Sequence, residues 1–173
     1  MTPRSLPFAL LALLGLACDP VDPAPDGGTG GPDANVDPSL ELGTGEGFFQ
    51  PFEDGDTLDL VSGCQGSQHV WIALRAEGID PRGPIIDLEL VRDSDGTVVS
   101  QAFTVRVSFD AVAGTPHADV YGLTLVVPEP DQAIGEDLTV RATVTDMNEV
   151  TVMDERPIRI DWGEGGCRGP APG

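Results

Sequence analysis

Lysine is absent from this chain of 173 residues. All nine of its cationic residues are arginines, and they stand against 29 Asp and Glu residues, for a net charge of −20. A nucleic-acid partner needs many cations to neutralise its phosphates, so we expect no nucleic acid to bind. The same charge disfavours docking on anionic lipid by electrostatics alone. Solubility and repulsion from like-charged surfaces follow from it directly.

Cysteine is scarce as well, with three residues in the whole chain: Cys18, Cys64 and Cys167. No CxxC pair and no Cys/His ligand spacing occurs, so the sequence predicts no metal site and no cofactor. Long apolar runs are also missing after the first 18 residues. The run from Phe8 to Ala17 is too short to cross about 30 Å of hydrocarbon as a helix.

The first 18 residues have the layout of a secretory signal. Arg4 precedes the apolar run, and no acidic residue occurs before Asp19. The end of this segment, Leu16-Ala17-Cys18, resembles the lipobox of bacterial lipoprotein precursors, in which a small residue precedes a cysteine that is lipidated and becomes the new N-terminus. Gly15 departs from that pattern, because the family usually has Leu there.

This resemblance implies that Cys18 is a lipid anchor and that the protein is exported and held to a membrane of the bacterial cell envelope. We expect the outer membrane or the cell surface rather than the inner membrane, although Asp19 leaves the leaflet open. The alternative is an ordinary cleaved signal peptide in which Cys18 is incidental.

Residues 19–40 are dominated by Pro, Gly and Asp, with almost nothing apolar to bury. Such a segment cannot offset its ordering entropy, so we expect a disordered tether. The sequence then predicts a β-sandwich domain over residues 41–167 and a short tail over residues 168–173.

Apolar residues alternate with polar ones in six stretches of the predicted domain, which is typical of half-buried antiparallel strands. Turn residues separate these stretches, and Asp95-Gly96 is a strong hairpin signal. We therefore expect an all-β fold of seven or eight strands with no helix. The expected inward-facing residues are Val70, Ile72, Leu74, Ile86, Leu88, Leu90, Phe103, Val105, Val107, Phe109, Tyr121, Leu123, Leu125, Val127, Leu138, Val140, Ala142, Val144, Ile158, Ile160 and Trp162.

The order and spacing of these strands over residues 57–162 resemble an immunoglobulin-like or fibronectin-like sandwich. The stretch from Leu40 to Ala76 also resembles uncharacterised exported proteins of myxobacteria, which implies a sandwich of unknown role. Once Cys18 is assigned to the anchor, two cysteines remain, and export permits them to form a disulfide. In an immunoglobulin-like order Cys64 and Cys167 would lie at the same pole, so we predict that they are bonded.

Few residues are candidates for chemistry, and each has a structural interpretation. Cys64 with His69 could form a nucleophilic pair, but a disulfide beside a strand start is the simpler interpretation. His69 and His117 lack ligand spacing for zinc. The acidic turns at residues 52–57 and 92–97 lack the length of a calcium-binding loop. Trp71 is either exposed as a ligand platform or covered by a second layer, and we expect it to be covered.

These observations favour a non-enzymatic, lipid-anchored envelope protein whose sandwich binds another protein, in adhesion or in envelope assembly. A carbohydrate- or calcium-dependent binding module is the alternative, and an envelope enzyme without a recognisable motif is a second. If the two cysteines share a pole, the loops 77–84 and 145–150 lie at the other pole. We predict that these loops bind the partner through Arg82, Met147 and Asn148.

Overall fold

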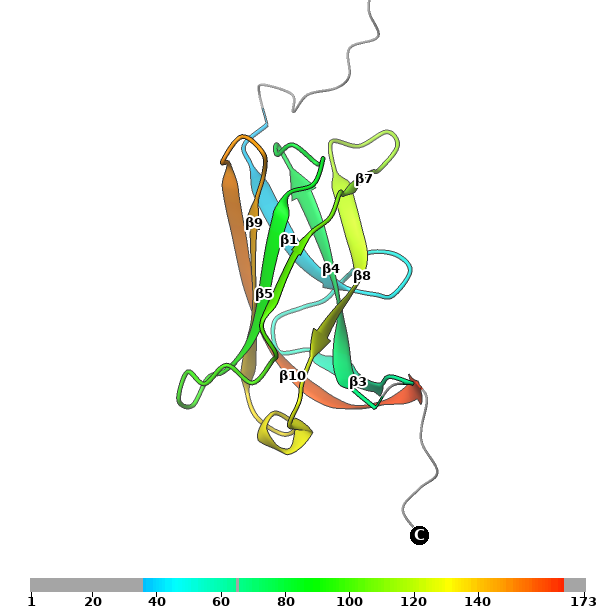
Figure 1. The fold of residues 1–173 in the computed structure, drawn as a ribbon, viewed down its shortest axis with the longest axis vertical. Coiled ribbons are helices and arrows are strands. Elements are labelled where there is room, and N and C mark those ends of the chain that lie inside the picture. The colour runs from blue at the N-terminus through cyan, green and yellow to red at the C-terminus, as the bar shows by residue number, and fades with distance from the viewer. Residues whose placement is uncertain (1–35, 65, 167–173) are drawn as a thin grey trace, which may run out of the picture.

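A computed structural model describes residues 36–64 and 66–166 of the chain (Figure 1). The predicted signal segment, Cys18, most of the predicted tether, Cys167 and the tail lie outside these residues. The strands are β1 (Ser39–Thr44), β2 (Gln50–Pro51), β3 (Thr57–Ser62), β4 (Gln68–Glu77), β5 (Ile85–Arg92), β6 (Phe103–Arg106), β7 (Asp110–Ala111), β8 (Ala118–Val126), β9 (Leu138–Thr145) and β10 (Thr151–Gly166).

The all-β prediction is confirmed for the described residues, where the one helical element is a 3-10 turn at Pro130–Gln132. The strands number ten rather than the expected seven or eight, because β2 and β7 are extra strands of two residues each. β1 starts at Ser39, two residues before the expected start of the domain at Glu41.

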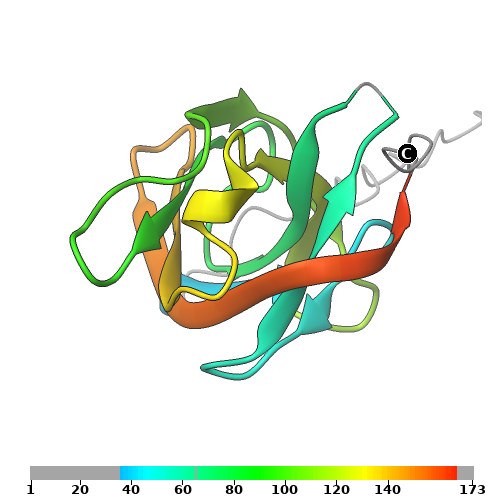
Figure 2. The same cartoon turned by 90° about the horizontal axis from the view of Figure 1, so that it is seen from below.

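The strands form a single curled sheet with the order β2-β1-β4-β3-β10-β9-β5-β6, while β8 pairs with the other edge of β4 and β7 pairs with β8. Almost all pairs are antiparallel, but β3 and β10 run parallel. The curl brings β4 and β8 opposite β5 and β9 (Figures 1 and 2), which is compatible with a β-sandwich.

β10 belongs to both layers of this fold. Its first half, from Thr151 to Ile158, pairs with β9, and its second half, from Arg159 onward, pairs with β3. Figure 2 shows it as one long band that runs from the β9 side to the β3 side. The two layers are therefore halves of one continuous sheet.

Pro157 sits where β10 changes partner. Its carbonyl accepts a hydrogen bond from Gly55 N, at 2.7 Å. In a strand the N–H and C=O of one residue point to the same side, so the N–H that proline lacks would face Gly55 and not β9. The ladder to β9 loses no bond, which is why a proline is tolerated inside this strand.

Asp154 bridges the two layers where β1 lies beside β10 without pairing to it. Its carboxylate accepts hydrogen bonds from Leu42 N (2.8 Å) in β1 and from the neighbouring Glu155 N (3.0 Å). The same carboxylate pairs with Arg156, at 3.1 Å from Nε. One side chain thus supplies the acceptor that two backbone donors at this seam would otherwise lack.

The core lies between the two layers and confirms most of the expected alternation. Ile86, Leu88 and Leu90 of β5 are buried, while Asp87 and Glu89 between them face outward. In β9 every second residue from Leu138 to Val144 is buried. The stretch from Phe103 to Phe109 is a strand only as far as Arg106, because the chain then crosses to the other layer. Of the apolar residues in that stretch, Phe109 is fully buried and Phe103, Val105 and Val107 are partly buried.

Two aromatic residues expected in the core are outside it. Tyr121 is 40% exposed, because the ladder between β8 and β4 shifts register here and Gly122 has a positive φ of 72°. A register shift turns the following side chains to the other face. Trp162 is 51% exposed, and the ladder between β10 and β3 becomes irregular immediately after it.

The domain has two ends, which we name by one residue each (Figure 1). The Asp80 end carries the start of β1, the loop 78–84 between β4 and β5, and the loop 146–150 between β9 and β10. The Cys64 end carries the turn after β3, the end of β10, the turn 93–97 and the 3-10 turn. The prediction that loops 77–84 and 145–150 lie opposite Cys64 is confirmed.

Replacing Asp154 tests whether its carboxylate holds the two layers together. We expect Asp154→Ala to lower the free energy of unfolding by about 1–3 kcal/mol, because Leu42 N, which is buried, loses its acceptor. Urea titration followed by circular dichroism measures the change. Asp161→Ala is the matched control, since Asp161 is exposed and its carboxylate accepts from the adjacent Trp162 N. Equal effects of the two variants would contradict the bridging role.

Candidate functional site

Two buried carboxylates organise the Asp80 end. Asp80 and Asp146 are each only about one-twentieth exposed, and Asp80 N donates to Asp146 Oδ2 at 2.8 Å. Asp146 Oδ1 also accepts from Asn148 N (2.7 Å) and Val150 N (2.9 Å), which shapes its own loop. These hydrogen bonds to buried carboxylates therefore hold the loops 78–84 and 146–150 together on the core side.

Arg82 is the arginine that the sequence placed in a partner-binding loop. Its backbone N, Nε and Nη2 donate to the carboxylate of Asp80 at 3.0, 2.9 and 2.8 Å. These bonds lower the pKa of Asp80 to about 2. The side chain of Arg82 is nevertheless 77% exposed, so it presents a fixed charge to solvent.

Arg106, at the end of β6, completes this surface. Its Nη1 donates to the carbonyl of Gly83 (2.8 Å) and to the sulfur of Met147 (3.0 Å), so it joins the two loops from outside. Sequence reasoning missed Arg106, because nothing in an alternating strand marks one arginine as different from another. The structure brings Arg82, Met147 and Asn148 together as predicted and adds Arg106.

The loop 78–84 is held on its far side as well. Val107 N donates to Pro84 O (3.3 Å), and Phe109 N donates to Pro81 O (2.9 Å). These donors come from the segment that crosses from β6 to β7. The loop therefore lies on a rigid base, which favours recognition by preorganised side chains.

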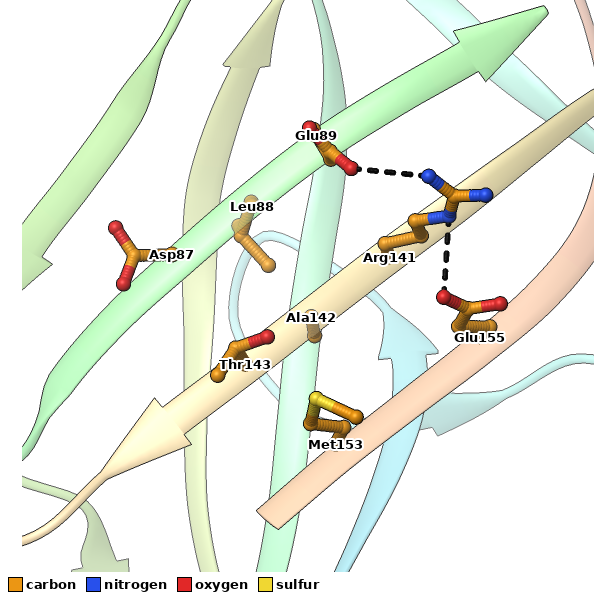
Figure 3. Close-up of a pocket in the computed structure, with 8 residues that line it drawn as sticks. All are labelled: Asp87, Leu88, Glu89, Arg141, Ala142, Thr143, Met153 and Glu155. Carbon is orange, nitrogen blue, oxygen red and sulfur yellow. Dashed lines mark hydrogen bonds and ion pairs between the residues drawn. The ribbon is translucent and has the colours of Figure 1, made fainter. Parts of the chain in front are cut away.

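A second surface is the outward face of β5, β9 and β10, which we call the outer face (Figure 3). Arg141 lies directly across from Glu89 on one side and Glu155 on the other. Its guanidinium pairs with both, at 3.3 Å from Nη1 and 3.1 Å from Nε. Beside this row is a shallow hollow of about 340 Å³, lined by these residues and by Asp87, Leu88, Ala142, Thr143 and Met153.

Met153 is the most exposed large apolar side chain in the described part of the chain, at 67%. It lies on the outer face next to the row of Glu89, Arg141 and Glu155 (Figure 3). Exposed ion pairs of this kind contribute only about 0.2–1 kcal/mol to stability. The row therefore contributes little to the stability of the fold, and nothing in the alternating sequence singles these residues out.

The outward side of β4 carries Trp71, which is half-buried rather than fully covered. The covering segment is the loop after β1, because Gly45, Glu46 and Gln50 line the same hollow as Trp71. Phe49 of this loop packs against β4 under the guanidinium of Arg75, which lies 4.2 Å from the ring centre. The expected second layer exists, although it leaves part of Trp71 open.

The histidines do not form a joint site. His69 pairs with Val126 at one end of the β4–β8 ladder, and His117 precedes β8 at the other end, where its imidazole contacts the carboxylate of Glu77. Burial lowers the pKa of His69, whose ring stands edge-on against Trp71. Among residues 36–64 and 66–166, no group of three or more His, Cys, Asp or Glu side chains is placed to hold a metal ion.

One of the two cysteines of the predicted disulfide, Cys167, lies outside the described residues. The turn after β3 holds Cys64, and β10 runs parallel to β3 so that Gly166 pairs with Ser62. The backbone therefore comes to within one residue of Cys167 beside the strand that leads to Cys64. The bond between the two cysteines stays a prediction.

The low pKa of Asp80 makes the Asp80 end sensitive to acid. Because the folded pKa lies below the unfolded value of 3.8, the contribution of Asp80 to stability is full above about pH 4 and is lost as the pH falls through about 2. We expect Asp80→Asn to unfold at a lower temperature than the parent at pH 6, and the difference to vanish near pH 2. Scanning calorimetry over this range checks it.

The control for this measurement is Asp131→Asn, which changes an exposed carboxylate at the Cys64 end. It should follow the parent at every pH. If the unfolding temperatures of Asp80→Asn and the parent differ by the same amount at every pH down to 2, the negative charge of Asp80 is not what stabilises the loop.

Neither protein-family models nor curated proteins give a match to this chain. None of the described residues forms a helix that is long and apolar enough to cross a membrane. Function must therefore be inferred from the surfaces themselves, and the Asp80 end and the outer face both present exposed side chains on a rigid base.

Proposed function

We propose that this chain is an exported, lipid-anchored protein of the bacterial cell envelope whose β domain binds a protein partner without catalysing a reaction. The anchor would be Cys18, at the end of the signal segment, and its support is the sequence Leu16-Ala17-Cys18. Adhesion and envelope assembly are the roles that such a domain fits.

An immunoglobulin-like order is the finer description that we propose for the fold. The pairings β1-β4-β8-β7 and β10-β9-β5-β6 support it, since each layer then holds four antiparallel strands. A bond between Cys64 and Cys167 would staple the Cys64 end. The parallel run of β3 beside β10 supports this pairing, because both strands end there.

The exposure of Met153 beside the ion-pair row is the observation that carries the proposal of protein binding. Met and Arg are enriched at protein interfaces, and here they lie on regular strands that need little ordering on binding. The face also carries three carboxylates, Asp87, Glu89 and Glu155, against one arginine. We therefore propose a partner with a basic surface, which matches the net charge of −20.

The anchor is tested on the mature protein extracted from its native membrane. We expect the mass of its N-terminal peptide to show Cys18 as the first residue, carrying at least two acyl chains, because one chain gives only marginal anchoring. Cys18→Ser should release the protein from the membrane fraction. An unmodified N-terminus beyond Cys18 would contradict the anchor and leave an ordinary signal peptide.

The outer face is tested by a photo-crosslinking amino acid introduced at position 153 of the full-length protein in the native envelope. We expect one discrete adduct, which Glu155→Lys reduces at least fivefold because it repels a basic partner, and which weakens at high salt because exposed charges are screened. The same crosslinker at Tyr121, exposed on β8, is the control position. Adducts of equal yield at both positions, or none at position 153, would reject the outer face as the binding surface.

A further inference from the structure

The chain outside the described residues joins the domain at the Asp80 end. β1 begins at Ser39, which pairs with Glu77, and Gly78 packs closely against Val36 and Pro38. The 17 residues from 19 to 35 separate this point from Cys18. Such a length reaches about 60 Å when fully extended and roughly 20–25 Å as a flexible coil. A lipid on Cys18 would therefore keep the Asp80 end close to the membrane.

The side chains exposed at this end suit a phospholipid surface. Of the seven arginines in the described ranges, Arg106 is the one with no ion pair there, and it lies beside Met147, which is 61% exposed. Arg82 adds a second guanidinium, and the carboxylates Asp80 and Asp146 lie buried beneath. Guanidinium groups bind phosphate with paired hydrogen bonds, and a methionine can enter the apolar side of the interface.

The two ends differ in charge. The Asp80 end has three exposed carboxylates, Asp37 before β1, Asp110 beside the loop 78–84 and Glu149, against the two arginines Arg82 and Arg106. The Cys64 end has six carboxylates in its turns against two arginines, Arg92 and Arg159; the six are Asp93, Asp95, Glu129, Asp131, Glu136 and Asp137. Among exposed side chains the Cys64 end is the more acidic of the two, so an anionic membrane repels it more strongly and favours the orientation in which the Asp80 end faces the lipid.

We propose that the Asp80 end rests on the phospholipid headgroups of the membrane that holds the anchor, through Arg82, Arg106 and Met147. This inference rests on the proposed lipid on Cys18. Each arginine near an anionic surface raises binding only about fivefold, so the untethered domain would bind weakly. The tether makes the contact intramolecular, at an effective concentration in the millimolar range, so a weak contact is enough. The outer face and the Cys64 end then stay accessible to partners.

The experiment uses the mature, lipid-carrying protein reconstituted into vesicles of phosphatidylcholine and phosphatidylglycerol in equal parts, with brominated acyl chains that quench indole fluorescence. Met147→Trp places an indole at the proposed contact. Trp71 and Trp162 provide the background in the parent, and Trp162 lies toward the Cys64 end. We expect strong quenching of the added fluorescence in Met147→Trp and little quenching in the parent.

Arg106→Gln in the Met147→Trp background removes one charge while keeping a hydrogen-bond donor, and should lower the equilibrium constant for docking about fivefold, which reduces the quenching. Arg82 is left in place, because its removal would leave the buried Asp80 unpaired. Arg159→Gln, an exposed arginine toward the Cys64 end, is the matched control and should leave quenching unchanged. Circular dichroism checks that each variant is folded.

Flotation of the vesicles separates the two proposals. Protein that does not float with the vesicles shows that the anchor has failed. Protein that floats without quenching at position 147, or with quenching that Arg106→Gln and Arg159→Gln change equally, overturns the membrane contact. Fluorescence at position 147 that changes only when an envelope protein is added, without quenching by the brominated chains, would also overturn it and assign this end to a protein partner.

Discussion

The course of β10 is the constraint on which the rest of the structure depends. It pairs first with β9 and then with β3, so a single strand fixes the spacing and the twist of both layers. Pro157 is compatible with this change of partner because its missing donor faces away from β9. Asp154 closes the seam that remains, since β1 and β10 lie side by side there without a backbone ladder.

Because β10 reaches from one end of the domain to the other, it also relates the surfaces to one another. Its start shapes the loop at Asp146, its middle carries Met153 and Glu155 on the outer face, and its last residues run beside the strand that leads to Cys64. The candidate surfaces thus share one rigid element. Movement of one surface relative to another would require breaking ladders on both sides of β10.

The choice of arginine rather than lysine for the ion pairs suits this rigid fold. Six of the seven arginines in residues 36–64 and 66–166 are paired with carboxylates, several of them through two nitrogens. A guanidinium can hold such fixed, planar contacts, whereas an ammonium group acts as a point charge on a flexible stem. In a chain with so many carboxylates, an arginine left without an ion pair is conspicuous, and Arg106 directs attention to the end where the N-terminal segment joins.

The sequence by itself determined the all-β class, most of the buried positions in β4, β5 and β9, and the grouping of the loops at Arg82 and Met147. Period-two alternation and turn residues are local signals, so they can be recognised without knowing which strands pair with one another. Tertiary structure decided the split pairing of β10, the outward turn of Tyr121 and Trp162, and the roles of Arg106, Asp154 and Met153. These depend on which strand lies beside which and in what register, and the alternation of a strand is the same for every neighbour that it could have.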